Sequence, residues 1–252
     1  MDLLVENRKL YLDLLQKSIL NLIYEDAPLT PWLAEQATFD MGKRAKGLDW
    51  PSVAHSMIGA LRMANLRQLC ETVIENRIAG DFIETGVWRG GSCIMMRGIL
   101  KSYGDRTRRV WVADSFAGLP PPNAEEYPAD HGDAFHTYKE LAVSLDQVKS
   151  NFRKYGLLDE QVVFLQGWFK DTLPAAPIEQ LAVLRLDGDM YESTIQALTA
   201  LYDKLSPGGF VIVDDYGCVE GCRQAVTDFR AARGIDERII DIDGTGVYWK
   251  KQ

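Results

Sequence analysis

Two acidic clusters follow two apolar runs of this chain, and their residue types are those that bind a hard metal ion. Asp187-Gly188-Asp189 comes directly after the run 181–186, and Asp214-Asp215 follows the run 208–213. Four carboxylates at the ends of buried strands repel one another and resist desolvation, so they would be costly without a cation. Oxygen ligands of this kind suit Mg²⁺ rather than zinc or copper. The pattern therefore predicts a divalent metal at the top of an α/β sheet, where such sheets bind ligands.

A second candidate binding element is the loop from Glu84 to Ser92, which reads ETGVWRGGS and follows another apolar run. Its glycines would let a ligand approach the backbone, and the helix that it opens would offer free N–H groups. Trp88 stands where the dinucleotide-binding pattern GxGxxG has its middle glycine, so a pyrophosphate would be crowded. Glu84 would also repel a phosphate. This loop therefore favours a cationic ligand over a dinucleotide.

The elements that must position these residues alternate between short apolar runs and amphipathic stretches after residue 79. We expect strands near 81–85, 109–113, 162–166, 181–186 and 209–213, and helices near 91–103, 140–155, 191–205 and 219–233. This alternation predicts an α/β fold with a doubly wound, mostly parallel sheet. Asp243-Gly244 lies between apolar runs near 237–242 and 246–250, which predicts an antiparallel C-terminal hairpin.

The rest of the chain would complete a single domain over residues 1–252, with a helical cap (1–78), a core (79–252) and a lid within that core. Cap helices are expected near 7–24, 31–46 and 58–77, and the residues that share one face of the first are Leu10, Leu14, Leu15 and Ile19. The lid, at about 118–140, is rich in proline and carries His131 and His136. A long irregular segment in a compact domain is often functional.

Composition narrows the classes of partner. The 252 residues carry a formal net charge of −8, which argues against a nucleic-acid partner because phosphate backbones bind basic surfaces. No run is long and apolar enough for a membrane span, and the first residues are acidic where a signal peptide would be basic, so we expect a cytoplasmic protein without a membrane partner. Four cysteines are too few for a disulfide scaffold.

The ordered motifs resemble the TylF/MycF (macrocin-type) family of class I S-adenosylmethionine-dependent methyltransferases, which methylate sugar hydroxyls of natural products. The motifs are PSVAHSMIG at 51–59, ETGVWRGGS at 84–92, WVADSF at 111–116, GWFKDTLP at 167–174, LRLDGDMY at 184–191 and LSPGGFVIVDDY at 205–216. The resemblance covers nearly the whole chain. It implies a Rossmann-like methyltransferase fold and an O-methyltransferase activity.

The resemblance also implies a binding site for S-adenosylmethionine. The residues that would contact this cofactor are Met57, Glu84, Thr85, Gly86, Ser92, Asp114, Ser115, Gln166, Gly167, Trp168 and Asp187. Glu84 would lie near the charged amine of the methionine part, and Asp114 would accept both ribose hydroxyls. Trp168 would lie near the adenine, and Met57 would fold over the cofactor from the cap.

The same resemblance places Mg²⁺ on Asp187, Asp214 and Asp215, with open positions for two oxygens of a sugar diol. Asp189 would be the general base, and a lid histidine, His131 or His136, is the rival. The acceptor would be a small glycosylated molecule from the biosynthesis of an antibiotic or a related natural product.

Two other enzyme activities stay open from the sequence. A catechol-type O-methyltransferase would use the same metal, because a vicinal diol on an aromatic ring presents the same pair of oxygens. A metal-dependent glycosyltransferase of the D-x-D type would use Asp187-Gly188-Asp189, although Glu84 and Trp88 disfavour its nucleotide diphosphate. The apolar N-terminal helix further predicts a homodimer.

Overall fold

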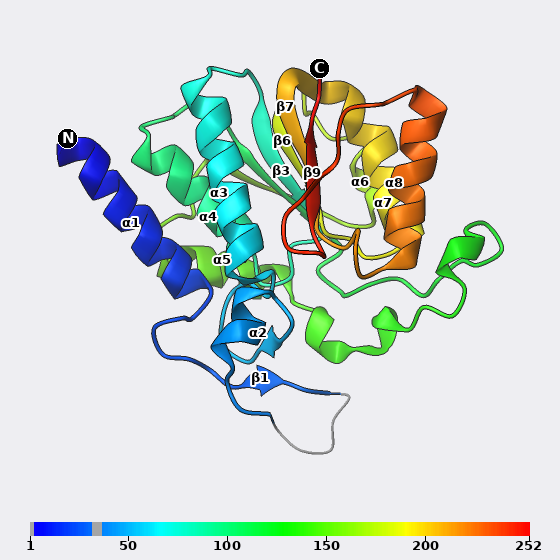
Figure 1. The fold of residues 1–252 in the computed structure, drawn as a ribbon, viewed down its shortest axis with the longest axis horizontal. Helices are drawn as coiled ribbons and strands as arrows, with labels where there is room; N and C mark the ends of the chain where they lie inside the picture. The colour runs from blue at the N-terminus through cyan, green and yellow to red at the C-terminus, as the bar shows by residue number, and fades with distance from the viewer. Residues whose placement is uncertain (1–2, 32–36) are drawn as a thin grey trace.

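The computed structural model describes residues 3–31 and 37–252, and its central feature is a seven-stranded sheet (Figure 1). The strand order is β5-β4-β3-β6-β7-β9-β8. These strands are β3 (Asp81–Thr85), β4 (Val110–Asp114), β5 (Val162–Gln166), β6 (Leu181–Leu186), β7 (Leu205–Val213), β8 (Ile240–Asp241) and β9 (Val247–Lys250). Strands β3 to β7 run parallel, whereas β9 is antiparallel to both β7 and β8. The expected parallel sheet with an antiparallel C-terminal hairpin is confirmed.

Helices cover both faces of this sheet (Figure 1). They are α1 (Leu3–Ile19), α2 (Met41–Ala45), α3 (Gly59–Glu75), α4 (Gly91–Ser102), α5 (Leu145–Lys154), α6 (Phe169–Thr172), α7 (Tyr191–Leu201) and α8 (Glu220–Arg233). One apolar cluster joins the sheet to α1, α3, α4 and α5, and a second joins it to α7 and α8. Successive strand residues point to opposite faces, so Phe82 belongs to the first cluster and Ile83 to the second.

The expected helix over 31–46 is wrong for most of the residues that the structure describes there. Residues 32–36 lie outside the described part, 37–40 are not helical, and only α2 forms, with the Asp40 side chain accepting from the Lys43 N–H at its start. The physical reason is tertiary. The Arg44 side chain is 1% exposed and pairs with Asp26 and Asp49, so a buried ion-pair network determines the local backbone. A short antiparallel pair, β1 (Pro28–Leu29) with β2 (Trp50–Pro51), completes this part of the cap.

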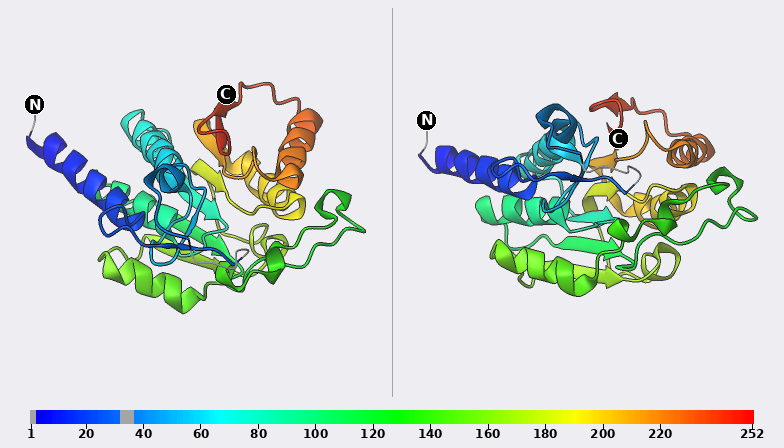
Figure 2. Two further views of the ribbon diagram at one scale, coloured as in Figure 1. Left: turned by 60° about the horizontal axis from the view of Figure 1, so that its bottom comes forward. Right: turned by 90° about the horizontal axis from the view of Figure 1, so that it is seen from below.

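Helix α1 begins nearer the N-terminus than expected, and its apolar stripe is only half buried. Leu15 and Ile19 pack into the core, whereas Leu10 and Leu14 are 62% and 58% exposed. Figure 2 shows that the N-terminal part of α1 projects away from the rest of the molecule. The expectation that one face unites all four residues is therefore wrong for Leu10 and Leu14.

The cap loops and the lid both lie beyond the carboxyl ends of the parallel strands (Figures 1 and 2). The lid contains three 3₁₀ turns, at Pro128–Asp130, Phe135–Thr137 and Lys139–Leu141. Helix α5 starts later than expected because the Ser144 hydroxyl accepts from the Gln147 N–H and caps it there. Helix α7 ends at Leu201, and a 3₁₀ turn over Tyr202–Lys204 leads into β7.

Candidate active site

A cavity of about 380 Å³ opens at the carboxyl ends of β3, β4, β5, β6 and β7, and most of the expected site residues line it. The expected residues in its wall are Met57, Gly86, Asp114, Ser115, Gly167, Trp168, Asp187, Asp189, Asp214 and Asp215. Cap residues such as Trp50 and lid residues such as Phe135 and Leu141 close its outer side. The structure therefore gathers ten of the expected cofactor, metal and base residues around one space.

Six other expected residues lie outside this wall. Thr85 and Ser92 are buried behind it, and Gln166 is exposed at the end of β5. Glu84 is 1% exposed and accepts hydrogen bonds from Cys93 and Arg185. His136 is exposed on the lid, and so is His131.

Gly86 brings the loop after β3 into contact with the loop after β6. Its φ of +86° is one that residues with a side chain rarely adopt. A Cβ atom at this position would lie 1.8 Å from the backbone oxygen of Asp187, so no side chain fits. The absence of a side chain thus allows the cofactor loop and the acidic loop to pack backbone against backbone.

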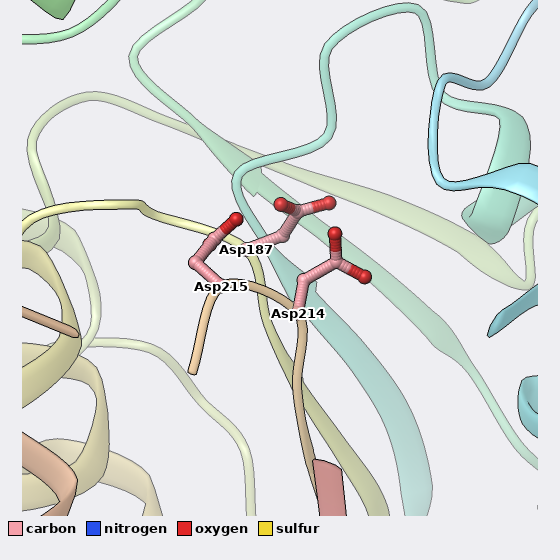
Figure 3. Close-up of side chains that lie close together, drawn as sticks. All are labelled: Asp187, Asp214 and Asp215. Carbon is pink, nitrogen blue, oxygen red and sulfur yellow. The ribbon is translucent and has the colours of Figure 1, made fainter. Parts of the chain in front are cut away.

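Three carboxylates at the ends of β6 and β7 converge in the cavity wall (Figure 3). Asp187, Asp214 and Asp215 each offer an oxygen atom, and these atoms all lie within 4.8 Å of one another. Burial and the neighbouring charge of Asp214 raise the pKa of Asp187, and burial raises that of Asp215. Because a cation would relieve this repulsion, the cluster has the chemistry of a site for a hard divalent ion.

Two buried arginines that the sequence analysis did not single out also contact this cluster. Arg185 on β6 donates to Glu84, to Asp187 (Nη1 to Oδ2, 2.6 Å) and to Asp214. Arg62 on α3 donates to the other oxygen of Asp214. Arg185 carries a visible signal, since it is the one charged residue in the run Leu181–Leu186. Arg62 has no such sequence signal, because arginine is common within helices.

Asp189 lies beside the three carboxylates in a left-handed backbone conformation with φ of +58°. Its N–H donates to Oδ2 of Asp215 at 3.2 Å, which ties the two acidic loops together. Burial and the charge of Asp214 raise the pKa of Asp189 to about 7. A carboxylate with this pKa accepts a proton more readily near neutral pH than an ordinary aspartate does.

Asp114 ends β4 on the opposite side of the same cavity. The backbone N–H groups of Val87 and Phe116 each donate to one of its carboxylate oxygens, at 2.7 Å in both cases. Burial raises its pKa. These two contacts fix the orientation of the carboxylate at the end of the second parallel strand, the place from which an acidic side chain reaches a ribose.

The cap and the lid are each fastened to the core beside the cavity. Arg89 Nη1 donates to the carbonyl oxygens of Pro51 and Ala54, at 3.1 and 2.8 Å, and so holds the cap segment that leads to Met57. Trp88 Nε1 donates to the carbonyl oxygen of Glu140 on the lid at 2.8 Å. The loop after β3 thus contacts both the cap and the lid beside the cavity.

A further lid contact reaches the helix that follows the acidic loop. Asp130 is 3% exposed and accepts from the N–H groups of Tyr191 and Glu192 at the start of α7, at 2.7 and 2.9 Å. No sequence signal points to this role, because Asp130 is one of several acidic residues in an irregular segment. In the described part of the chain, no helix is both long and apolar enough to cross a membrane.

Comparisons with known proteins identify the family and the fold of this chain. The model of the macrocin-O-methyltransferase (TylF) family matches residues 8–251. The chain is 54% identical to a tetracenomycin-derivative 4'-O-methyltransferase of Streptomyces olivaceus, over 96% of the chain and 93% of that protein. It is 51% identical to mycinamicin III 3''-O-methyltransferase of Micromonospora griseorubida, over 96% of both chains.

The solved structure of the O-methyltransferase NovP superposes with a TM-score of 0.92 at 52% identity, covering 97% of this chain and 99% of that one. The calicheamicin methyltransferase CalS11 shares the fold, with a TM-score of 0.61 at 20% identity over 76% of this chain and 79% of that one. Family and fold lead to one conclusion: the chain belongs to the macrocin-O-methyltransferase family and is an S-adenosylmethionine-dependent O-methyltransferase.

Proposed function

We propose that this enzyme transfers the methyl group of S-adenosylmethionine to a sugar hydroxyl of a glycosylated natural product, with Mg²⁺ bound at Asp187, Asp214 and Asp215. The observation that carries the proposal is the convergence of these three carboxylates in the cavity that Asp114 and Gly86 also line. The names of two relatives that are more than half identical describe methylation of primed positions, which supports a sugar acceptor. Family membership gives no support to the glycosyltransferase or catechol alternatives.

The charges around the acidic loops favour a bound cation. Six carboxylates and two guanidinium groups, those of Arg62 and Arg185, lie together here. When all of them are ionised, the negative charges exceed the positive ones by four. The carboxylates belong to Glu84, Asp187, Asp189, Asp214, Asp215 and Asp243. Within the described residues, no hydrogen bond reaches Oδ1 of Asp187 or Oδ1 of Asp215. These oxygens suit the all-oxygen coordination that Mg²⁺ prefers.

The residues of the chain divide the work of methyl transfer. Mg²⁺ would lower the pKa of an acceptor hydroxyl and orient it. Asp189 would take the hydroxyl proton on its carboxylate, since it lines the cavity beside the proposed metal ligands. Asp114 would hold the ribose of the cofactor, whereas Met57 and the lid would exclude water. Such positioning of two reactants can supply up to roughly 7–11 kcal/mol of the barrier.

The outer part of the cavity supports an acceptor with an apolar aglycone. Its wall there carries Leu48, Trp50, Phe135, Leu141 and Val219, contributed by the cap, the lid and the segment before α8. Leu48 on this wall is 60% exposed, so an apolar group of the acceptor would cover surface that otherwise faces water. The names of the relatives at 51–54% identity give different methylated positions, so the overall match does not identify the acceptor of this enzyme.

The test is a methyl-transfer assay with a panel of deoxysugar-bearing macrolides and aromatic glycosides, together with catechol. We expect a methylated sugar in the presence of Mg²⁺, located by NMR, and its loss with a chelator or in Asp214→Asn. Asp203→Asn, in a surface ion pair with Arg233, is the matched control and should remain active. Methylation of catechol alone would refute the sugar proposal. Full activity with the chelator would refute the metal requirement.

We also propose that the enzyme is a homodimer that buries the outer face of α1. Leu3, Leu10 and Leu14 on this helix are 69%, 62% and 58% exposed, an arrangement that is unfavourable in water. Light scattering should therefore give the mass of a dimer, and Leu10→Glu with Leu14→Glu should give a monomer. A monomeric wild-type protein would contradict this proposal.

A further inference from the structure

Both carboxylate oxygens of Asp214, one of the three proposed metal ligands, already contact a positive side chain. Arg185 Nη2 donates to Oδ1, and Arg62 Nη1 donates to Oδ2. The two arginine side chains are buried, with 1% and 6% of their surface exposed. The two arginines therefore place positive charge at the same carboxylate that would bind the proposed Mg²⁺.

The two arginines differ in how they are held. Arg185 belongs to a central strand and also contacts Glu84 and Asp187, so it is built into the sheet. Arg62 lies in the cavity wall and reaches the site from α3. Its Nε donates to Oδ2 of Asp243 at 3.1 Å, in the turn before β9. It also contacts the carbonyl oxygens of residues 46 and 47 in the cap, at 3.2 and 3.3 Å.

The guanidinium of Arg62 has two opposite effects on a metal at this site. It orients Asp214, which favours metal binding, and its positive charge would repel a divalent cation held by that carboxylate, which opposes binding. Removing it would leave the Asp214 carboxylate held by Arg185, so the orientation would be lost only in part. The repulsion would be lost entirely. We therefore expect the change in charge to have the larger effect on metal affinity.

We propose that Arg62 is an internal counter-cation of the acidic centre: it stabilises the metal-free enzyme and lowers its affinity for Mg²⁺, and Asp243 limits this effect by partly neutralising Arg62. This inference rests on the proposed metal-dependent function. It assigns to Arg62 a role in setting how tightly the metal is held. The site can then stay folded when empty and release the metal readily.

The experiment titrates Mg²⁺ into wild-type protein and charge variants by calorimetry and follows thermal unfolding with and without the metal. Arg62→Gln adds one net negative charge and should tighten Mg²⁺ binding about tenfold or more. Asp243→Asn keeps the oxygen that accepts from the N–H groups of Thr245 and Gly246 but removes a negative charge, so binding should weaken. The double variant restores the charge balance and should bind like the wild type.

Unfolding gives an independent readout. Arg62→Gln should unfold at a lower temperature without metal, and Mg²⁺ should raise its unfolding temperature more than it does in the wild type. Arg67→Gln is the matched control, because Arg67 lies on the same helix and pairs with Asp13 and Glu71 instead of the acidic centre. It should leave Mg²⁺ affinity unchanged.

The outcomes separate this inference from the proposed function. If neither the wild type nor Arg62→Gln binds Mg²⁺, the proposed metal requirement fails. If the wild type binds Mg²⁺ and Arg62→Gln binds it equally or more weakly, only the role assigned to Arg62 is wrong, and Arg62 mainly orients Asp214. If Arg62→Gln folds only with metal present, the proposal is supported. The Mg²⁺ affinities of Asp243→Asn, which should be weaker than that of the wild type, and of the double variant, which should equal it, then test the proposal independently.

Discussion

The contact between the lid residue Asp130 and the start of α7 provides a sharp test of how the lid positions the acidic loop. Asp130 accepts from two backbone N–H groups at the first turn of this helix. Asp189 precedes that turn directly, at the end of the loop that follows β6. Replacing Asp130 should therefore loosen the lid and disturb Asp189 at the same time.

The expected magnitude follows from these two hydrogen bonds. Removing an N-terminal cap of a helix costs about 0.5–2 kcal/mol, and a hydrogen bond to a charged group contributes about 1.5–3 kcal/mol. Because Asp130 is buried and water would replace it poorly, Asp130→Ala should destabilise the protein by about 2–4 kcal/mol. Asp130→Asn retains one acceptor and should be destabilised by about half as much. A displaced Asp189 should lower kcat on the order of tenfold.

The assay is urea unfolding together with steady-state methyl transfer, measured under conditions in which each variant is folded. Glu125→Gln is the matched control, since Glu125 is an exposed carboxylate of the same lid. It should change stability little and leave kcat unchanged. An Asp130→Ala variant with wild-type stability and wild-type kcat would refute the anchoring role of this contact.

Three more predictions concern the remaining site and cap residues. Asp114→Ala should weaken the binding of S-adenosylhomocysteine by at least about tenfold in calorimetry, because the carboxylate proposed to hold the ribose is gone; unchanged affinity would remove it from the cofactor site. Asp189→Asn should lower kcat by roughly 10²–10⁴-fold with metal binding retained, whereas His136→Ala should remain active, and the reverse result would assign the base to the lid. Burial, with the charges of Lys154 and Arg89, lowers the pKa of His55 to about 4. The contribution of His55 to stability is then complete above its unfolded pKa of about 6.5 and is lost as the pH falls towards 4, so His55→Gln should flatten that part of the stability curve in urea unfolding.

The sheet and the main acidic residues could be predicted from the sequence because their signals are local. Each parallel strand is a short apolar run, and Asp114, Asp187 and Asp214 occur where such runs end. Parallel strands bring these ends to one edge of the sheet. Their meeting in one cavity therefore follows from the order of the elements alone.

The cap could not be predicted in the same way, because contacts distant in sequence determine it. Residues 37–46 form only a short helix, since Arg44 is buried against Asp26 and Asp49. The contacts of Arg62 have the same origin: Asp214 is 152 residues away and Asp243 is 181 residues away. A periodicity within ten or twenty residues carries no information about such pairs. Only the fold brings them together.

The backbone contact at Gly86 has a consequence for how relatives of this enzyme can come to accept different molecules. At Gly86, the loop after β3, which is proposed to bind the methyl donor, packs against the backbone of the acidic loop at Asp187, with no room for a side chain between them. Their separation does not depend on what lines the outer cavity. Substitutions in the cap or the lid, at Trp50 or Phe135 for example, can therefore reshape the acceptor space while the reacting groups keep their distance. The choice of the methylated hydroxyl can then change independently of the methyl-transfer step. A new acceptor can be accommodated without changes in the proposed catalytic centre.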